Sequence, residues 1–344
     1  MTYKVAVVGA TGTVGREVLA ILEERNFPIS KVVALASESS LGKEVSYGEK
    51  DILKVENLAH YDFAGTDFAF FCAGSKVAKD YAPKAAAAGS IVIDHSSHFR
   101  LEPGIPLIVP EVNGSVLDKG FKKNIIANAN CIAIPLTLAL KPLHDIAPIK
   151  RVVISTYQSV SGAGQRAMDE LFHQTKAMFV NEDQKPQEFT KPIAFNLIPH
   201  IDAFNRDGST GEEEKIIMET RKILDPSIKV TATCVRVPVF IGHSISATIE
   251  FDSEITPAQA RQAYGIEKGV IVLDRPEEDG YITPLEIAGE DMVAVSRIRQ
   301  DPTVKHGLSL WIVGDNLRKG AALNGVQIAE TLINQKASKR AIKH

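Results

Sequence analysis

The sequence predicts an α/β protein, with a doubly wound parallel sheet in the first part of the chain and a mixed sheet of α+β type in the second. Three observations carry this prediction. A β-branched strand pattern opens the chain and runs through a glycine-rich turn into an amphipathic helix pattern. Strand and helix patterns then alternate, as they do in doubly wound sheets. Beyond residue 131 the strand patterns alternate only partly between apolar and polar residues, which is typical of a sheet with one more polar face.

The first strand is Lys4 to Val8, a continuous apolar run expected of a strand buried on both faces. The sequence GATGTVG at residues 9–15 follows it, and behind this turn one helical face carries Val14, Val18, Ile21 and Leu22. Glycines let the backbone approach a pyrophosphate closely, and the free amides of a helix entrance bind its charge. The spacing differs from the plain G-x-G-x-x-G and also suits a tight turn without a ligand. Its place at the start of a strand–helix–strand unit favours a dinucleotide site.

The second strand, Lys31 to Ala36, ends where such sites distinguish NAD from NADP. An acidic side chain about 20 residues past the glycines binds the ribose 2′-hydroxyl and repels a 2′-phosphate, so Glu38 by itself favours NAD. Neighbouring hydroxyl and ammonium groups favour a phosphate instead, and these belong to Ser37, Ser39, Ser40 and Lys43. The residues alone leave the choice of cofactor open.

The alternation continues with a strand at Phe68 to Cys72, an alanine-rich helix at Lys76 to Ala88 and a strand at Ile91 to Ile93. A polar sequence from Asp94 to Arg100 follows the last of these strands. Open α/β sheets place their sites at the carboxyl ends of the strands. Arg100 is therefore a candidate anion ligand, with a surface ion pair as the alternative.

The turn Asn128 to Cys131 ends in a thiol and leads into the apolar stretch Ile132 to Leu140. A free cysteine is often an inert filler of the core. Cys131 differs because it lies at a polar-to-apolar junction, where a helix entrance would direct amide hydrogens at the sulfur and favour the thiolate. Further polar groups follow downstream, at Gln158 and between Arg236 and His243. Cys131 is therefore a candidate nucleophile, with core filler as the alternative.

The second part of the chain shows four strand patterns, at Arg151 to Ser155, Lys229 to Val239, Ser244 to Phe251 and Leu308 to Val313. Between them, a loop at Asp207 to Gly211 precedes the charged run EEEK at residues 212–215. This run is most simply the acidic first turn of a helix. A closing helix is expected from an apolar face made of Ala322, Val326, Ala329 and Ile333.

The composition bounds the class of protein. At 344 residues the chain is expected to form about two domains, and 44% apolar and 24% charged residues are typical of a soluble globular protein. A formal charge of −3 argues against a general nucleic-acid binder. The three widely spaced cysteines predict neither a disulfide framework nor a zinc site. Cys72 and Cys234 are expected to be core residues, with a position near the site as the alternative for Cys234, which shares a strand face with Arg236. Without a signal-peptide pattern or a stretch of roughly 20 apolar residues, we expect a cytoplasmic protein that does not cross a membrane.

With these motifs in place, the chain resembles bacterial aspartate-β-semialdehyde dehydrogenases over essentially its whole length. The matching stretches are residues 8–12, 110–113, 155–164, 234–238, 242–244 and 315–322. The resemblance implies a Rossmann NADP-binding domain at residues 1–129, joined by a C-terminal helix at 316–340. It implies a mixed-sheet catalytic and dimerisation domain at residues 130–315. The family reduces L-4-aspartyl phosphate to L-aspartate 4-semialdehyde with NADPH, in the biosynthesis of diaminopimelate, lysine, threonine, isoleucine and methionine.

The resemblance also assigns three residues to the chemistry. Cys131 would form a thioacyl intermediate, His243 would act as the acid/base, and Gln158 would orient the substrate. A thiolate is both a strong nucleophile and a good leaving group, so an acyl enzyme can be made from an acyl phosphate and broken by hydride. Imidazole exchanges protons near neutral pH.

Other matched positions would bind the substrate and the cofactor. Arg236 would hold the substrate carboxylate, with Glu212 near its ammonium group and Asn130 beside the thiol. Arg100 and Lys215 would bind the phosphate group, since separate cations suit a phosphoryl group. The positions that would contact the cofactor are Gly9, Thr11, Gly12, Thr13, Val14, Ser39, Ser40, Ser161, Gly162 and Asn316. The resemblance implies no metal.

The sequence departs from the family at a few of these places. Ala129 and Ile132 replace the proline and the hydroxyl residue that usually flank the thiol, and Pro135 replaces a common glutamine. Pro135 lacks the amide hydrogen that would close the first helical turn onto Cys131, which predicts a late start of the regular helix. Ser39 stands where many relatives carry an arginine for the 2′-phosphate. NADP is still favoured by the family, with NAD as the alternative.

Two other functions compete with the first. N-acetyl-γ-glutamyl-phosphate reductase shares the chemistry on a longer substrate, and a catalytically silent relative would only bind nucleotide. The amino-acid sequence of residues 234–243 favours the aspartyl enzyme over the acetylglutamyl enzyme. The presence of both Cys131 and His243 argues against a silent relative. Such enzymes act on small molecules, bind neither nucleic acid nor membrane, and are typically homodimers.

Overall fold

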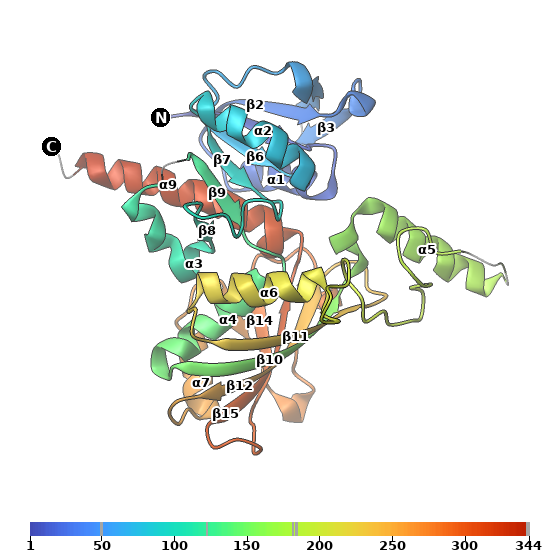
Figure 1. Ribbon diagram of the computed structural model, residues 1–344, viewed down its shortest axis with the longest axis vertical. Helices are drawn as coiled ribbons and strands as arrows, with labels where there is room; N and C mark the ends of the chain where they lie inside the picture. Colours follow the sequence, from blue (N-terminus) through green and yellow to red (C-terminus); the bar gives the residue numbers. More distant parts are fainter. Residues whose placement is uncertain (49–50, 122, 181, 183–184, 342–344) are drawn as a thin grey trace. The chain divides into compact units, whose positions relative to one another are not determined.

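The structure, a computed structural model, describes residues 1–48, 51–121, 123–180, 182 and 185–341 (Figure 1). The chain forms two compact units, residues 1–130 with 321–344 and residues 131–320. Among the described residues, no helix is both long enough and apolar enough to span a membrane. The second unit ends at Gly320, whose amide bonds to the carbonyl of Asp315, 2.8 Å away.

The first unit is built on one parallel sheet, which confirms the predicted fold class. Its strand order is β5-β2-β1-β6-β7-β9-β8. The strands are β1 (Tyr3–Val8), β2 (Ile29–Ala36), β5 (Glu56–Asn57), β6 (Phe68–Phe71), β7 (Ile91–Asp94), β8 (Leu107–Ile108) and β9 (Ile125–Asn128). A separate antiparallel pair consists of β3 (Glu44–Tyr47) and β4 (Asp51–Lys54). The helices are α1 (Thr13–Glu24), α2 (Ser75–Ala87), α3 (Pro110–Asn113) and α9 (Leu323–Ala341).

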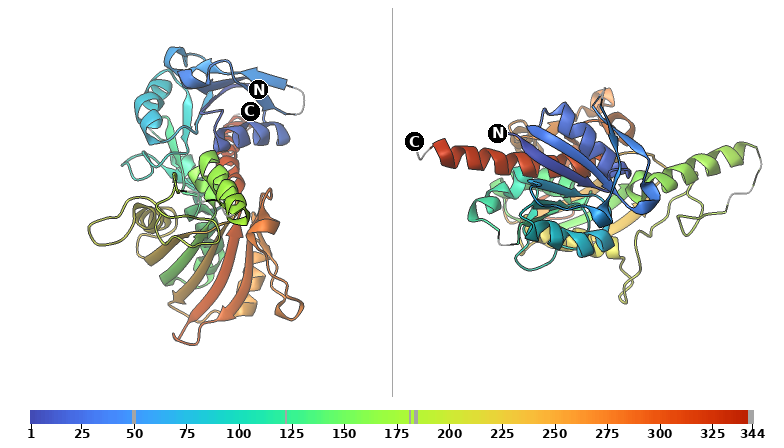
Figure 2. Two further views of the ribbon diagram at one scale, coloured as in Figure 1. Left: turned by 90° about the vertical axis from the view of Figure 1, so that its right-hand side faces the viewer. Right: turned by 90° about the horizontal axis from the view of Figure 1, so that it is seen from above.

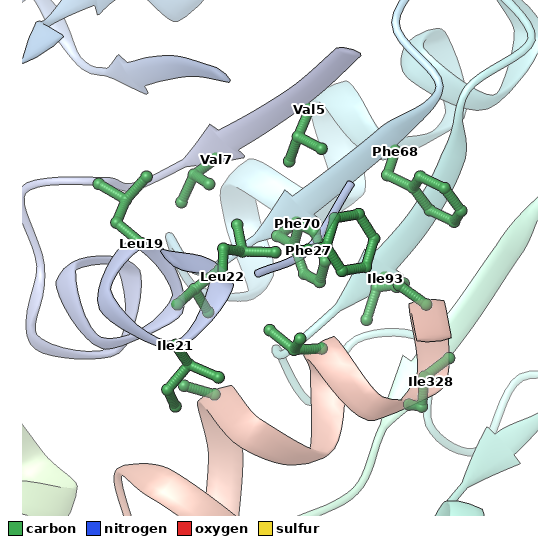
Figure 3. Close-up of a cluster of buried hydrophobic side chains, with 14 of the residues drawn as sticks. Val5, Val7, Leu19, Ile21, Leu22, Phe27, Phe68, Phe70, Ile93 and Ile328 are labelled. Carbon is green, nitrogen blue, oxygen red and sulfur yellow. The ribbon is translucent and has the colours of Figure 1, made fainter. Parts of the chain in front are cut away.

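The hydrophobic core of this unit includes residues of the C-terminal helix α9 together with residues of the N-terminal β1 and α1. Figure 3 shows side chains of β1 and β6, among them Val7 and Phe70, facing Leu22 of α1 and Ile328 of α9. The apolar face predicted for the closing helix is thus buried against the sheet beside α1. Removing this much apolar surface from water is the main stabilising contribution of such a contact.

The second unit is built on a mixed sheet, also as predicted, with the strand order β11-β10-β12-β15-β14-β13 (Figure 2). The strands are β10 (Ile149–Gln158), β11 (Lys229–Arg236), β12 (His243–Phe251), β13 (Val270–Val272), β14 (Val293–Gln300) and β15 (Gly307–Gly314). Strands β10 and β11 are parallel, as are β13 and β14, and the other neighbours are antiparallel. The helices are α4 (Ala133–Ile146), α5 (Gln165–Phe179), α6 (Gly211–Ile223), α7 (Pro257–Tyr264) and α8 (Pro284–Ile287).

One face of the mixed sheet is covered and the other is partly exposed. Helix α4 contacts both α6 and α7 on the covered face. Along β10 the residues on this face are buried and the intervening ones are half-buried. This is the partial alternation seen in the sequence.

The expected end of one strand was wrong. Strand β11 ends at Arg236 rather than Val239, because Pro238 has no amide hydrogen to continue a strand ladder. The late helix start predicted from Pro135 agrees with α4, which begins at Ala133, two residues after Cys131. Its first turn is closed by the amide of Leu136 on the carbonyl of Ile132, 3.1 Å away, because Pro135 has no amide hydrogen to donate to Cys131.

Candidate active site

The candidate nucleophile lies at the start of the second unit. Cys131 is half-buried and comes two residues before α4. Gly320 packs against it, since a Cβ at that position would lie 3.3 Å from the carbonyl oxygen and 3.4 Å from the Cβ of Cys131. Gly320 belongs to a π-helical turn, Arg318–Ala322, and such turns are frequent at functional sites. The glycine therefore lets this turn approach the thiol.

Arg236 is the cation that the fold brings to this thiol. It is buried at the end of β11, and its Nη1 donates to the carbonyl of Ser159 at 2.8 Å. Burial lowers the pKa of Arg236, while the nearby thiol of Cys131 and then the carboxylate of Glu212 oppose this shift. A guanidinium stays protonated even so. Its charge is thus available to favour the thiolate form of Cys131.

The pairing of β10 with β11 places further polar residues next to Arg236. Gln158 aligns with Arg236 and Thr156 with Cys234. Cys234 is buried, as expected, and burial raises the pKa of its thiol to about 12. Cys234 therefore stays protonated at neutral pH and does not compete with Cys131 as a nucleophile.

A chain of hydrogen bonds connects Gln158 to α6. The Oγ1 of Thr156 donates to the Oε1 of Gln158 (2.9 Å), and the Nε2 of Gln158 donates to the Oε1 of Glu212 (3.1 Å). The Oε2 of Glu212 binds the Nζ of Lys215 at 2.8 Å, and Asp202 binds the same ammonium at 2.9 Å. Burial by itself lowers the pKa of Lys215, but the two carboxylates outweigh this effect and raise it. The structure thus brings Glu212 and Lys215 together with Gln158, with the charge of Lys215 already balanced.

His243 is held from one side. Its Nδ1 accepts hydrogen bonds from the backbone amide of Ser159 (3.0 Å) and lies 3.0 Å from the Oγ of the same residue. Burial and then the charge of Arg236 lower the pKa of His243 to about 3, with Glu212 opposing them, so the ring is neutral at physiological pH. Within the described part of the chain, the buried Nε2 has no hydrogen-bond partner. An unsatisfied buried donor costs about 1–3 kcal/mol, and each such case calls for a functional explanation.

The side chain of Asn316 bonds to residues next to His243. Its Oδ1 accepts from the amide of Gly242 (2.9 Å) and from the hydroxyls of Ser159 (3.1 Å) and Ser161 (3.2 Å). Its Nδ2 donates to the Oγ of Ser161 at 2.9 Å. The two expected cofactor contacts Ser161 and Asn316 are therefore bonded to each other beside His243.

Gly162 packs closely against two side chains of the site. A Cβ built on Gly162 would lie 3.1 Å from the Nη1 of Arg236 and 3.2 Å from the Nε2 of His243. Both separations are tighter than ordinary contacts. A side chain at this position would therefore press against Arg236 and His243.

The first unit contains a cavity that suits a dinucleotide. It has a volume of about 720 Å³, and residues of the glycine turn, the end of β2 and α2 line it, including Gly9, Thr11, Gly12, Ser37, Glu38 and Lys76. Gly9 has φ +85°, and a Cβ there would lie 2.9 Å from the backbone of Cys72. Gly12 caps α1, whose first turn includes Thr13 and Val14 and has no acidic residue. A tight glycine turn at a helix entrance fits a pyrophosphate.

The hydroxyls beside Glu38 are partly engaged with one another. Ser37 and Ser39 lie 3.0 Å apart through their Oγ atoms, and both are exposed. Ser40 is buried, with its Oγ 3.5 Å from the Oγ1 of Thr11. Glu38 is exposed and lines the cavity. The structure thus places both the acidic side chain and the hydroxyls at the end of β2.

Arg100 and Asn130 belong to the first unit, and both are buried. The Nε of Arg100 donates to the carbonyl of Asn128 and its Nη2 to the carbonyl of His95, each at 3.0 Å. The alternative of a surface ion pair is therefore wrong. These two carbonyl partners orient the guanidinium. A carboxyl group also lies near it, since burial raises the pKa of Asp94 and the charge of Arg100 opposes this shift.

Two residues that contribute to this geometry were not predicted. Asp202 holds Lys215 and also explains Gly211, since a Cβ on that glycine would lie 2.9 Å from the Oδ2 of Asp202. Ser159 holds His243. Ser159 was detectable as a neighbour of Gln158, whereas Asp202 carries no signal in its own sequence. In the described residues, no group of side chains is suited to hold a metal ion.

Comparisons with known proteins agree over nearly the whole chain. A family model described as "Semialdehyde dehydrogenase, NAD binding domain" matches residues 4–120, and one described as "Semialdehyde dehydrogenase, dimerisation domain" matches residues 140–319. The chain is 56% identical to an aspartate-semialdehyde dehydrogenase of Rickettsia conorii over 96% of this chain and 98% of the relative.

Two solved structures are also similar. Aspartate semialdehyde dehydrogenase II from Vibrio cholerae, complexed with ASA, has a TM-score of 0.94 and 42% identity over 97% of this chain and 99% of that one. The enzyme from Candida albicans, solved with NADP, has a TM-score of 0.75 and 25% identity over 96% of this chain and 98% of that one.

Proposed function

The chain belongs to the aspartate-semialdehyde dehydrogenase family, and we propose that it interconverts L-4-aspartyl phosphate and L-aspartate 4-semialdehyde through a thioacyl intermediate on Cys131. The observation that carries this proposal is the burial of Arg236 beside the thiol, in one unit with Gln158, Glu212 and His243. The reaction belongs to amino-acid biosynthesis. All the relatives described above carry the aspartate-semialdehyde name, which supports this substrate over the N-acetylglutamyl alternative.

The nucleophile in this proposal is the thiolate of Cys131, stabilised by the Arg236 guanidinium. The thiolate attacks the acyl carbon and expels phosphate, which leaves a thioester on the sulfur. A nicotinamide cofactor, when bound, would supply the hydride that reduces this thioester. Collapse of the adduct then releases the aldehyde and restores the thiolate. The hydrogen bond from Gln158 to Glu212 fixes both side chains beside this centre.

Two cationic positions serve the anionic groups of the substrate. Arg236 has the fork geometry that a carboxylate needs, and Glu212, beside it, carries the negative charge that would attract the substrate ammonium. Arg100 would serve the phosphate. Lys215 is a weaker phosphate ligand than the resemblance implies, because Asp202 and Glu212 balance its charge. Asn130, adjacent to the thiol, completes the set.

The experiment that tests the proposed reaction compares two aldehydes. Purified protein is assayed for phosphate-dependent reduction of NADP and NAD with L-aspartate 4-semialdehyde and with N-acetylglutamate semialdehyde. We expect turnover with the first aldehyde only, and only when phosphate is present. Activity confined to the acetylated aldehyde would transfer the chain to the alternative reaction, and no activity with either would favour a silent relative.

The cofactor in our proposal is NADP, and Glu38 limits the preference for NADP over NAD. Gly9, Thr11 and Gly12 line the cavity of the first unit and would hold the pyrophosphate, and the exposed hydroxyl of Ser39 would serve the 2′-phosphate. Ser161, Gly162 and Asn316, in the second unit, are the other positions that the resemblance assigns to the cofactor.

Neutralising Glu38 is therefore expected to raise the preference for NADP. In Glu38→Gln the ratio of kcat/KM for NADPH to kcat/KM for NADH should rise about tenfold, since one unit charge at contact distance is worth roughly 1 kcal/mol or more. Steady-state kinetics with both cofactors measures this ratio. Glu44→Gln, an exposed position on β3, is the control and should leave the ratio unchanged. An unchanged ratio in Glu38→Gln would mean that the carboxylate does not face the ribose.

The open face of the mixed sheet is the surface proposed for dimerisation. Residues of this face, including Tyr157, Thr248 and Trp311, are half-buried, and Tyr157 and Trp311 lie 5.5 Å apart by ring centroids. The dimerisation family model covers the strands that carry them. Light scattering is expected to give a dimer mass for the wild type and for the control Gln262→Glu on α7, and a monomer mass for Thr248→Glu. A monomeric wild type at micromolar concentration, or a dimeric Thr248→Glu, would contradict this surface.

A further inference from the structure

The dinucleotide cavity of the first unit is lined by three groups of residues. The glycine turn after β1 supplies the first group, which fits a pyrophosphate, and the end of β2 supplies the second, which fits a ribose. The third group comes from the turn at residues 57–60 and from α2, and it includes the apolar and aromatic side chains of Leu58, Val77 and Tyr81. Such side chains suit the flat face of an adenine base. The adenosine half of the cofactor would therefore lie between the end of β2 and α2.

Lys76 is the cation that lines this half of the cavity. It is the one lysine or arginine among the described residues of the lining, and the other basic side chain there is the imidazole of His60. One helical turn after Lys76 and Val77, residues 80–81 line the cavity as well, so this face of α2 is turned toward it. Lys76 is exposed, and within the described part of the chain its ammonium group forms no ion pair. Its charge is therefore available to a ligand.

The polar groups that follow β2 in the sequence contribute less to this lining. Ser37 and Glu38 line the cavity, whereas Ser39, Ser40 and Lys43 do not. The Oγ of Ser39 lies next to the lining, 3.0 Å from the Oγ of Ser37, and Ser40 is buried. The positive charge at the adenosine end therefore comes from α2 rather than from the residues around Glu38.

We propose that Lys76 binds the 2′-phosphate of NADP and that, with Glu38 in the same cavity, it sets the preference between NADP and NAD. The inference rests on the proposed function and deepens it, because the resemblance assigns no role to Lys76. An ammonium group binds a phosphate as a point charge and needs no fork geometry to do so. Lys76 thus supplies from α2 a positive charge that Ser39 does not provide, in a position where many relatives carry an arginine.

The charged side chains of the lining act on NADP in opposite directions. Glu38 repels a 2′-phosphate and favours the 2′-hydroxyl of NAD, and Asp80, the other carboxylate among the described lining residues, adds to the repulsion. A phosphate monoester carries about −1.5 to −2 charges at pH 7, and Lys76 attracts this group. NAD offers Lys76 no anionic group at that position. Removing the charge of Lys76 should therefore weaken the binding of NADP and leave the binding of NAD almost unchanged.

The test measures binding to the full-length protein by isothermal titration calorimetry, without substrate or turnover. The titrants are NADP, NAD and two fragments, adenosine 2′,5′-bisphosphate and 5′-AMP, which differ only in the 2′-phosphate. We expect Lys76→Gln to weaken the binding of NADP and of the bisphosphate about tenfold or more, and that of NAD and 5′-AMP by less than about twofold. Lys76→Arg keeps the charge and should bind NADP within about threefold of the wild type.

Two matched controls remove the same charge outside the lining. Lys79→Gln lies exposed on the same helix, Lys43→Gln lies exposed near Glu38, and both should bind all four ligands as the wild type does. Equal losses for NADP and NAD in Lys76→Gln would place Lys76 at the pyrophosphate and overturn the inference. Unchanged binding of NADP in Lys76→Gln, or an equal loss in Lys43→Gln, would also overturn it.

The outcome for the inference is separate from the outcome for the proposed function, because binding needs no turnover. A protein that shows the expected binding pattern but reduces neither cofactor with L-aspartate 4-semialdehyde would reject the proposed function and support the role of Lys76. A protein that is active on this aldehyde but binds the bisphosphate no better than 5′-AMP would reject the role of Lys76 and leave the proposed function in place.

Discussion

Replacing Cys131 by alanine is expected to reduce phosphate-dependent turnover of L-aspartate 4-semialdehyde by at least about 10⁴-fold and to leave the fold intact. The loss is large because the thiol forms and breaks the covalent bond in both halves of the reaction, and the remaining groups only bind and orient. Cys131 is half-buried and adjoins a helix start, so removal of its sulfur leaves little empty space. Steady-state kinetics measures the loss, and circular dichroism with thermal unfolding checks the fold.

Cys234→Ala is the matched control. Cys234 lies two residues before Arg236 on β11. Burial raises the pKa of its thiol to about 12, so it contributes no thiolate at neutral pH. Turnover of this variant should stay within about tenfold of the wild type, since only packing changes. A Cys131→Ala variant that keeps turnover, or a Cys234→Ala variant that loses it as fully, would show that the wrong thiol has been assigned.

Replacing Arg236 by lysine is expected to lower kcat/KM for the semialdehyde by about 10²–10³-fold, although the charge is retained. Lysine cannot present two parallel N–H groups to a carboxylate, and truncating one partner of a buried, hydrogen-bonded charge pair typically costs about 2–5 kcal/mol. The Nη1 bond to the carbonyl of Ser159 would also be lost. KM should rise more than kcat falls if binding of the carboxylate is the main role.

A second measurement separates the effect of Arg236 on the Cys131 thiol from its role in binding the substrate carboxylate. The rate at which iodoacetamide alkylates Cys131 at neutral pH reports its thiolate fraction, and this rate should fall in Arg236→Ala more than in Arg236→Lys. Arg221→Lys is the control, because Arg221 lies exposed near the end of α6 and bonds to the carbonyl of Pro226. Unchanged kinetics in Arg236→Lys would show that the guanidinium does not bind the substrate.

The fold was largely predictable because local patterns and burial agree in it. The apolar run of β1, the glycine turn and the amphipathic face of α1 each follow from short-range sequence, and the structure places all three as expected. The short strands β5 and β8 have two residues each and show no periodicity, so only the sheet around them defines them. The start of α4 after Cys131 was predictable, since Pro135 has no amide hydrogen to bond to the carbonyl of Cys131.

The candidate site was predictable as a set of residues but not as a network. Cys131, Gln158, Arg236 and His243 all stand in motifs, and all fall in one unit. The partners that fix them come from separate elements. Asp202 reaches Lys215 from a loop, and the amide of Ser159 reaches a histidine 84 residues away. A backbone amide has no side chain to mark it in a sequence, so the contact between Ser159 and His243 appears only in the structure.

The measurement that tests the central claim most directly is mass spectrometry of the acylated protein. The protein is mixed with L-aspartate 4-semialdehyde and oxidised cofactor without phosphate, quenched in acid and digested. The account predicts one aspartyl adduct, in thioester linkage on the peptide that contains Cys131, absent from Cys131→Ala and released when phosphate is added before the quench. An unmodified protein, or an adduct on the peptide of Cys72 or Cys234, would contradict it.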